Sequence, residues 1–242
     1  MSAHIAKNSG FADETLRGPA VKTIAMIPAR MGSQRLSKKN LRTLGGVPLI
    51  TRAIRKCQTA GVFDEVWVNS EAAEFGEIAQ SEGARFHQRP AQLADHVATS
   101  EQYVEEFLRQ HECECLLQIH SIAPLLSVQE IRDFVGAFRS GGHDTLLSYE
   151  AIQIECALNG RPVNFDFDRK TNSQDLSPVQ RITWSITGWR RVTYLAAAAA
   201  GRCATYSGHV GFYELSRNAA HVVKTAQDLD FAEAILKTQT DD

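Results

Sequence analysis

The chain has 242 residues, of which 43% are hydrophobic and 22% are charged, a composition typical of globular proteins. Its net charge of −2 lacks the broad excess of cations found in nucleic-acid-binding domains, so we expect no nucleic-acid partner. No apolar run approaches the roughly 20 residues of a membrane span, and residues 1–20 lack the features of a secretion signal, so we expect no membrane partner.

Strand-like and helix-like segments alternate along most of the chain. Residues 1–20 show no clean periodicity and are predicted to form a flexible N-terminal arm, followed by one domain over 21–242. Strands are expected at Val21–Pro28, Asp64–Ser70, Cys115–His120 and Asp144–Ala151, with amphipathic helices near residues 50–57, 71–83, 100–111 and 128–138. This alternation predicts a three-layer α/β fold, with a mostly parallel sheet covered by helices on both faces.

Residues 151–183 interrupt the alternation with a turn-rich excursion that contains a hairpin signal, Asn159-Gly160. Its apolar positions need a surface to bury against: Val163, Phe165, Phe167 and Val179. We expect a flap, a dimerisation arm, or both, and hence a homodimer. After the excursion, Thr225 and Asp228 form a capping box that predicts the start of the last helix.

Five cysteines are an odd number without the spacing of a disulfide framework. We expect them to be reduced thiols, which predicts a cytoplasmic protein.

A cationic loop follows the first predicted strand. It places Arg30, Arg35, Lys38 and Lys39 around Gly32, at the carboxyl end of the strand, where parallel sheets bind ligands. Cations and close backbone approach suit a phosphate chain. The loop matches neither the P-loop nor the GxGxxG pattern. We therefore expect a small anionic ligand, the alternative being a solvated basic turn.

This loop belongs to a longer segment, IPARMGSQRLSKKNLRTLGGVPLI, which is followed at intervals by RPAQLADHVATS, LLQ, SQDLSPV and TAQDLDFAEAI. In this order, the segments resemble motifs of the cytidylyltransferases that activate sialic acids and related 3-deoxy-ulosonic acids, the CMP-acylneuraminate synthetase family. The resemblance recurs over residues 21–237, and the first motif is its most specific part.

The resemblance implies a Rossmann-like nucleotidyltransferase fold and a transfer of CMP. The anomeric hydroxyl of an acidic sugar attacks the α-phosphate of CTP, and pyrophosphate leaves. Catalysis relies on positioning and charge neutralisation. By position, Lys39 would stabilise the attacked phosphate, with Arg30 as the second catalytic candidate, and Gln118 would face the acceptor. The implied nucleotide-binding residues are Pro28, Ala29, Arg30, Ser33, Asn40, Arg89, Ala98 and Ser100.

Several of these residues have a purely structural alternative. Arg89, before a proline, could anchor its loop, and Gln118, at a strand end, could cap backbone groups. Ser33 could act as a turn former and Asn40 as a helix cap.

The chain departs from the family pattern on the metal and acceptor side. The Asp-x-Asp pair that holds magnesium in the family falls on Val222 and Lys224, neither of which can ligate it. Asp95 and Asp228 remain as candidate ligands, although Asp228 is also explained as a helix cap. We therefore expect magnesium to arrive with CTP.

Three further positions on the acceptor side differ. The arginine expected for the acceptor carboxylate is Ser173, the Asn-Gly pair of the next strand is Thr183-Trp184, and the LLQPTSPLR pattern reads LLQIHSIAPLL. Cations of the excursion could replace the missing arginine: Arg161, Arg169, Lys170 and Arg181.

These departures leave three hypotheses open. The chain could cytidylylate a sialic-acid-like acid or a different acid such as a phosphonate. It could bring its metal through substrate oxygens together with Asp95 or Asp228, with Lys224 replacing the charge of one cation. It could also bind nucleotide without catalysis. We expect the substrates to be CTP and a small acidic acceptor.

Overall fold

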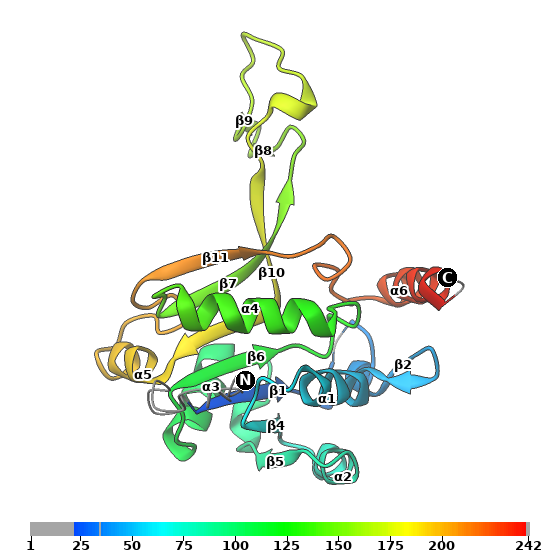
Figure 1. Cartoon of the computed structure of the whole chain (residues 1–242), viewed down its shortest axis with the longest axis vertical. Coiled ribbons are helices and arrows are strands. Elements are labelled where there is room, and N and C mark those ends of the chain that lie inside the picture. The colour runs from blue at the N-terminus through cyan, green and yellow to red at the C-terminus, as the bar shows by residue number, and fades with distance from the viewer. Residues whose placement is uncertain (1–21, 34, 241–242) are drawn as a thin grey trace, which may run out of the picture.

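A seven-stranded sheet organises the computed structural model, which describes residues 22–33 and 35–240 (Figure 1). The strand order is β11-β7-β10-β6-β1-β4-β5, and β10 alone runs antiparallel to its neighbours in this sheet. The strands are β1 (Thr23–Pro28), β4 (Glu65–Ser70), β5 (Arg85–Gln88), β6 (Cys115–Ile119), β7 (Thr145–Ile152), β10 (Val179–Arg190) and β11 (Val210–Glu214).

The two central strands, β1 and β6, are buried along nearly their whole length because both faces of the sheet are covered. On one face, α1 (Leu49–Ala60), α2 (Ala73–Ser81) and α4 (Val128–Ser140) form a core around Ile50, Phe75 and Phe134. On the other face, α3 (Ser100–Gln110) and α5 (Arg191–Ala199) pack around Phe107 and Tyr194. The predicted three-layer, mostly parallel fold is confirmed.

The last helix, α6 (Ala226–Thr240), packs at one edge of the molecule against a small hairpin, β2 (Thr43–Leu44) and β3 (Val47–Pro48). Gly45 and Gly46 make the turn of this hairpin with φ of 55° and 73°. The Gly45 N–H donates a 2.8 Å hydrogen bond to Glu233 Oε2 on α6. The hairpin lies in a segment for which the sequence pattern predicted no strand.

Local signals set most helix ends. The capping box expected at Thr225 and Asp228 is present: the Thr225 N–H donates to Asp228 Oδ2 at 2.8 Å, and the Asp228 N–H donates to Thr225 Oγ1 at 3.3 Å. Gly83 follows α2 with φ of 71°, a conformation in which glycine commonly ends a helix. None of the helices within the described residues combines the length and hydropathy that a bilayer span needs.

A narrow arm projects from the sheet where β7 and β10 extend beyond it (Figure 1). The last pair joining these two strands is Ile152 and Val179, and the intervening residues form the arm. At its first turn, Asn159 and Gly160 have φ of 51° and 75° and link β8 (Ala157–Leu158) to β9 (Arg161–Pro162). The hairpin predicted at Asn159-Gly160 is confirmed.

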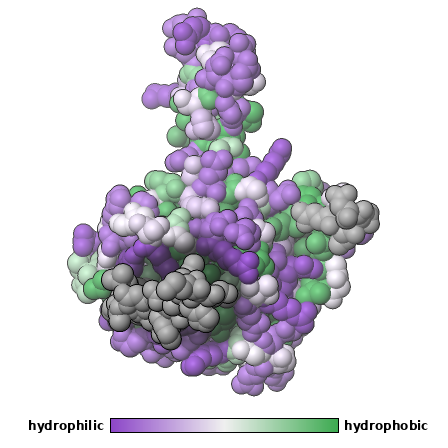
Figure 2. Space-filling view, viewed as in Figure 1, coloured by the Kyte–Doolittle hydropathy of each residue, from purple (hydrophilic) through white to green (hydrophobic). Residues whose placement is uncertain are grey.

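The arm exposes large apolar side chains, and Figure 2 shows apolar surface along its stem. Leu158 is 68% exposed and Phe167 is 74% exposed, and Ile154 and Val163 are also exposed. Of the cations in this excursion, Lys170 is paired with Glu155 and Arg181 with Glu150. A different segment, the flexible N-terminal arm predicted for residues 1–20, lies outside the described residues.

Candidate active site

A cavity of about 320 Å³ opens at the carboxyl ends of β1 and β6, where a ligand site is expected for such a sheet. Residues after β1, after β5 and after β6 converge on it, together with the first turn of α3. The lining residues are Pro28, Ala29, Arg30, Lys39, Asn40, Arg89, Leu93, Asp95, Ala98, Ser100, Tyr103, His120, Ser121 and Ile122.

Asn40 holds two of these loops together from a buried position. Its Nδ2 donates to the Arg30 carbonyl at 3.2 Å, and its Oδ1 accepts from Ser121 Oγ at 2.8 Å. The alternative role of Asn40 as a helix cap is wrong, because Asn40 lies inside the short 3-10 helix Lys39–Leu41, whose N-cap residue is Lys38. The Asn40 side chain shapes the cationic loop and fixes that loop against the segment after β6.

The loop after β6 is also held by a lysine of α1. Lys56 of α1 donates to the carbonyls of Pro124 and Leu126, the latter at 2.6 Å. Burial lowers the pKa of Lys56 to about 8, with Arg52 adding to the shift. A lysine that bonds two carbonyls in this way stabilises the loop that carries Ser121 and Ile122 to the cavity.

Lys39 is the half-buried cation of the cavity. Burial lowers its pKa first, and the charges of Arg35, Arg30 and Lys224 add to the effect, while Asp228 opposes it. No carboxylate of residues 22–33 and 35–240 forms an ion pair with Lys39. A site whose cations form no ion pair among the described residues is suited to an anionic ligand.

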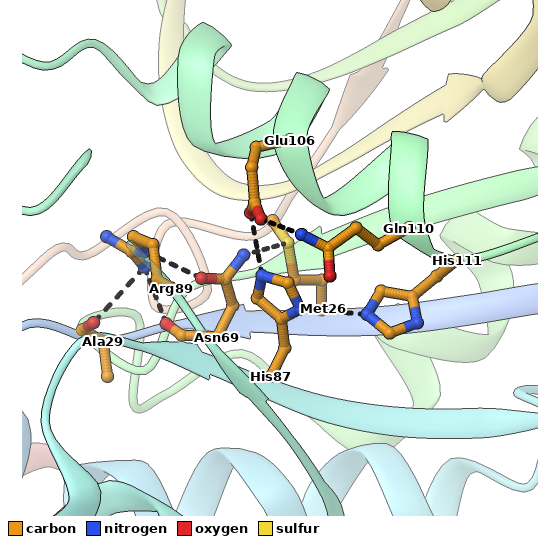
Figure 3. Close-up of polar contacts among 8 residues, drawn as sticks. All are labelled: Met26, Ala29, Asn69, His87, Arg89, Glu106, Gln110 and His111. Atoms are coloured by element: carbon orange, nitrogen blue, oxygen red, sulfur yellow. Dashed lines mark hydrogen bonds and ion pairs between the residues drawn. The ribbon is translucent and has the colours of Figure 1, made fainter. Parts of the chain in front are cut away.

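Arg89, at 3% exposure, is an anchor as well as a lining residue. Its Nε donates to Asn69 Oδ1 at 2.7 Å, and one terminal nitrogen donates to the Asn69 carbonyl at 2.6 Å (Figure 3). The same nitrogen lies 3.3 Å from the Ala29 carbonyl, and the guanidinium lies 4.3 Å from the centroid of the Tyr103 ring. Arg89 therefore joins β4, β5, α3 and the start of the cationic loop.

Behind this anchor, two histidines and a carboxylate form a chain of hydrogen bonds (Figure 3). His87 Nε2 lies 2.8 Å from Glu106 Oε2, and His87 Nδ1 lies 2.9 Å from His111 Nε2. Burial lowers the pKa of His111 to about 4, with His87 adding to the shift. These hydrogen bonds hold α3 in place, and the first turn of α3 supplies Ser100 and Tyr103 to the cavity.

His120 stands at the cavity directly after β6, within the segment that departs from the family pattern. Burial and the charge of Lys39 lower its pKa to about 4, so the imidazole is neutral near pH 7. It contacts the Gln118 side chain, whose Nε2 also lies 3.3 Å from the Tyr103 hydroxyl. Gln118 is 1% exposed and is not a lining residue, and its Oε1 has no partner within the described part of the chain.

Trp184 lies within β10, at a point where the strand is irregular. Its φ is 60°, a left-handed conformation that glycine adopts freely but that costs a bulky residue about 1–3 kcal/mol. The register of the pairing between β10 and β7 shifts between Ile182 and Thr187. The carbonyl of Ser185, the residue after Trp184, accepts a 3.1 Å hydrogen bond from the His120 N–H. The tryptophan ring lies 6.2 Å from that of Tyr206. Trp184 therefore adopts a left-handed conformation at a position where the family pattern has glycine.

The carboxylates near the cavity are engaged as helix and turn caps. Asp95 Oδ1 accepts the N–H groups of Val97 and Ala98, at 2.8 and 2.7 Å. Asp228 Oδ2 accepts the N–H groups of Lys224 and Thr225, together with Thr225 Oγ1. Val222 and Lys224 lie outside any strand, and no group of three or more metal-ligating side chains occurs among residues with described placement. The donor set does not fit a metal ion held by protein carboxylates.

Most of the predicted site residues meet at the cavity. The lining includes Lys39 together with Pro28, Ala29, Arg30, Asn40, Arg89, Ala98 and Ser100. Ser33 and Gln118 are not lining residues. Sequence reasoning missed Tyr103, His120, Ser121 and Ile122. Tyr103 lies one helical turn after Ser100, and the other three directly follow β6, so position alone could have indicated them.

A family model described as "Cytidylyltransferase" matches residues 24–237. Among curated proteins, N-acylneuraminate cytidylyltransferase A of Danio rerio is 33% identical over 165 residues, which are 66% of this chain and 38% of that protein. Pseudaminic acid cytidylyltransferase of Campylobacter jejuni is 27% identical over 239 residues, 90% of this chain and 97% of that protein. The chain thus spans less than half of the first relative and nearly all of the second.

Solved structures share the fold. A CMP:2-keto-3-deoxy-manno-octonic acid synthetase complexed with CTP superposes with a TM-score of 0.65 at 17% identity, covering 90% of this chain and 99% of that one. A 4-diphosphocytidyl-2C-methyl-D-erythritol synthase from Anaerococcus prevotii gives a TM-score of 0.63 at 13% identity, covering 90% and 99%. The expected Rossmann-like nucleotidyltransferase architecture is confirmed. With the family model spanning both the cationic loop and the last helix, the chain belongs to the cytidylyltransferase family.

Proposed function

We propose that this chain transfers CMP from CTP to an acidic sugar of the sialic-acid class, with release of pyrophosphate. The observation that carries the proposal is the cavity at the ends of β1 and β6, where Arg30, Lys39 and Asn40 of the family's first motif come together. The cations of this loop form no ion pair among the residues that the structure describes, which suits a triphosphate. The names of the relatives, which refer to N-acylneuraminate and pseudaminic acid, support an acidic sugar as acceptor.

In the proposed reaction, the acceptor hydroxyl oxygen forms a bond to the α-phosphorus of CTP as the bond to pyrophosphate breaks, and the hydroxyl proton is released. Arg30 and Asn40 position the triphosphate, and the Lys39 ammonium stabilises the charge that builds on the phosphate under attack. Pro28, Ala29, Ala98 and Ser100 border the nucleoside, and Arg89 holds their loops in place. Ser33 and Gln118 act from outside the lining, Gln118 by orienting His120 and Tyr103.

The acceptor subsite is proposed to lie toward His120 and Trp184, where the chain departs most from the family pattern. A different acid, such as a phosphonate, is the competing acceptor for the same site. Magnesium is proposed to arrive with the triphosphate, whose oxygens supply its ligands, since Asp95 and Asp228 are engaged as caps.

A homodimer is proposed from the exposed apolar side chains of the arm, which a second copy would cover. A cytoplasmic location is proposed from the five free cysteines, of which Cys57 and Cys115 are buried.

The test is pyrophosphate release, measured with CTP, ATP, GTP and UTP in turn against a panel of sialic-type acids and phosphonates. We expect release only when CTP and an acidic sugar are both present. Calorimetric titration with the same triphosphates should show the tightest binding for CTP. Equal affinities for all four would contradict the cytidine pocket. CTP binding without pyrophosphate release from any acceptor would favour a nucleotide-binding protein that has lost catalysis.

A further inference from the structure

A second lysine, Lys224, is brought to the rim of the cavity by its backbone. The Val223 N–H donates a 2.7 Å hydrogen bond to the carbonyl of Ile122, which lines the cavity. The Lys224 N–H donates to Asp228 Oδ2 at 2.9 Å. These two bonds fix where the Lys224 side chain begins, while the side chain itself is exposed to solvent. Its ammonium therefore stays hydrated, beside a backbone that is bonded to the cavity lining and close enough for its charge to act on Lys39.

Lys224 and Lys39 carry like charges that act on each other, and neither forms an ion pair with a carboxylate among the described residues. The Lys224 charge is one of those that depress the pKa of the half-buried Lys39, after burial, Arg35 and Arg30. The charge of Asp228 acts on Lys39 in the opposite sense, but its Oδ2 already accepts three hydrogen bonds at the start of α6. Cations gathered at one rim repel one another until an anion binds between them.

We propose that Lys224 binds the triphosphate together with Lys39, and that its fixed charge replaces a carboxylate-held metal ion in the transfer. The inference rests on the proposed function, because it takes CTP as the ligand. It follows from the donor set at this rim: Val222 offers no ligand atom, and the nearby Asp228 serves as a helix cap. During transfer, negative charge builds on the departing pyrophosphate, and a cation already in place stabilises it without rearrangement.

The experiment compares Lys224→Met, which keeps the aliphatic stem and removes the charge, with Lys224→Arg, which restores a cation. Arg202→Met, an exposed site after α5, is the matched loss of one positive charge. Each protein is titrated with cytidine, CMP and CTP, in EDTA and again with magnesium. A phosphate-binding role predicts a loss that grows with the number of phosphates, whereas a structural role would weaken cytidine binding equally.

We expect the native protein to bind CTP in EDTA. Lys224→Met should weaken CTP binding about tenfold or more, because hydrogen bonds to charged groups are among the stronger ones, and should change cytidine binding less than twofold. Lys224→Arg should recover most of the loss, and Arg202→Met should match the native protein. Unchanged CTP affinity in Lys224→Met, an equal loss for cytidine, or native CTP binding that requires magnesium would each overturn the inference. Absence of CTP binding by the native protein under all conditions would instead refute the proposed function.

Discussion

Ser121 Oγ donates a 2.8 Å hydrogen bond to Asn40 Oδ1, and this bond links two loops that lie 81 positions apart in the chain. One loop carries the cations of the cavity, and the other directly follows the central strand β6. Both atoms are buried, so neither has water as a ready substitute partner. The contact therefore determines how closely the two sides of the cavity approach each other.

Asn40→Ala should lower the free energy of unfolding by about 1–3 kcal/mol, because it leaves buried groups at Ser121 and Arg30 without their partner. It should also weaken CTP binding, since the cationic loop loses its tie to β6. Ser121→Ala should have a smaller effect. Urea denaturation of both variants and of the double variant measures the coupling, and strictly additive losses would show that the bond contributes nothing by itself.

Lys39→Ala should reduce the rate of pyrophosphate release by roughly 100-fold or more, with a much smaller effect on CTP affinity. The pKa of Lys39 is lowered chiefly by burial, so its ammonium is lost at a lower pH than that of an exposed lysine. Turnover should accordingly decline on the alkaline side as the pH rises through that lowered pKa. Steady-state rates over pH 6 to 10 test both points, and an unaltered rate in Lys39→Ala would remove this lysine from the mechanism.

Acid should destabilise the protein through His111. Burial lowers the pKa of His111 from 6.5 to about 4 in the folded state. As the pH falls from 6.5 towards 4, the unfolded chain takes up a proton that the folded chain does not, so stability decreases over that window and levels off below it. His120 adds a second slope of the same sign, because its pKa is also lowered to about 4.

His111→Gln should therefore flatten part of this pH dependence, as measured by urea denaturation at intervals between pH 4 and 7. The control is His96→Gln, the same substitution at an exposed position outside the buried histidine network. An identical slope in His111→Gln and the native protein would show that His111 is not protonated differently in the two states.

Arg89→Lys should destabilise the fold by about 1–3 kcal/mol, because an ammonium cannot reproduce the two bonds that the guanidinium makes to Asn69. Arg85→Lys, in the strand that ends one residue before Arg89 but with a largely exposed side chain, should change stability by about 0.5 kcal/mol or less. Thermal or urea denaturation distinguishes the pair. Equal effects at the two positions would mean that the buried network is not a principal anchor of the cavity.

Replacing residues 153–178 with an Asn-Gly turn should leave the sheet folded, because Ile152 and Val179 are already paired. If the arm forms the homodimer, light scattering should give a dimer for the native protein at micromolar concentration and a monomer for the shortened one. CTP titration of the shortened protein checks that the cavity is intact. A native monomer would exclude the proposed dimer.

Local patterns predicted much of this molecule. The buried run of β1, the cations that follow it, the Asn159-Gly160 turn and the capping box at Thr225 and Asp228 depend on neighbouring residues, and all are present in the structure. The Gly45-Gly46 turn could equally have been predicted, because paired glycines favour a two-residue hairpin loop. The strands that it joins are only two residues long, which leaves no strand pattern in the sequence.

Other features could not be predicted, since they depend on which strands become neighbours. The antiparallel strand β10 lies between β6 and β7, which brings Ser185 to the backbone of His120. The pairing of β4 with β5 places Asn69 beside Arg89, which gives that arginine its role as an anchor. Both relationships follow from sheet order, which the periodicity of a single segment does not contain.

The attachment of the arm has a consequence for local unfolding. Only β7 and β10 connect the arm to the sheet, and two-stranded ribbons are marginally stable by themselves. Its backbone amides should exchange with solvent deuterium through openings that cost far less than global unfolding, while those of β1 and β6 should exchange only when the whole domain opens. The arm and the sheet are thus separate cooperative units, and the cavity belongs entirely to the slower one.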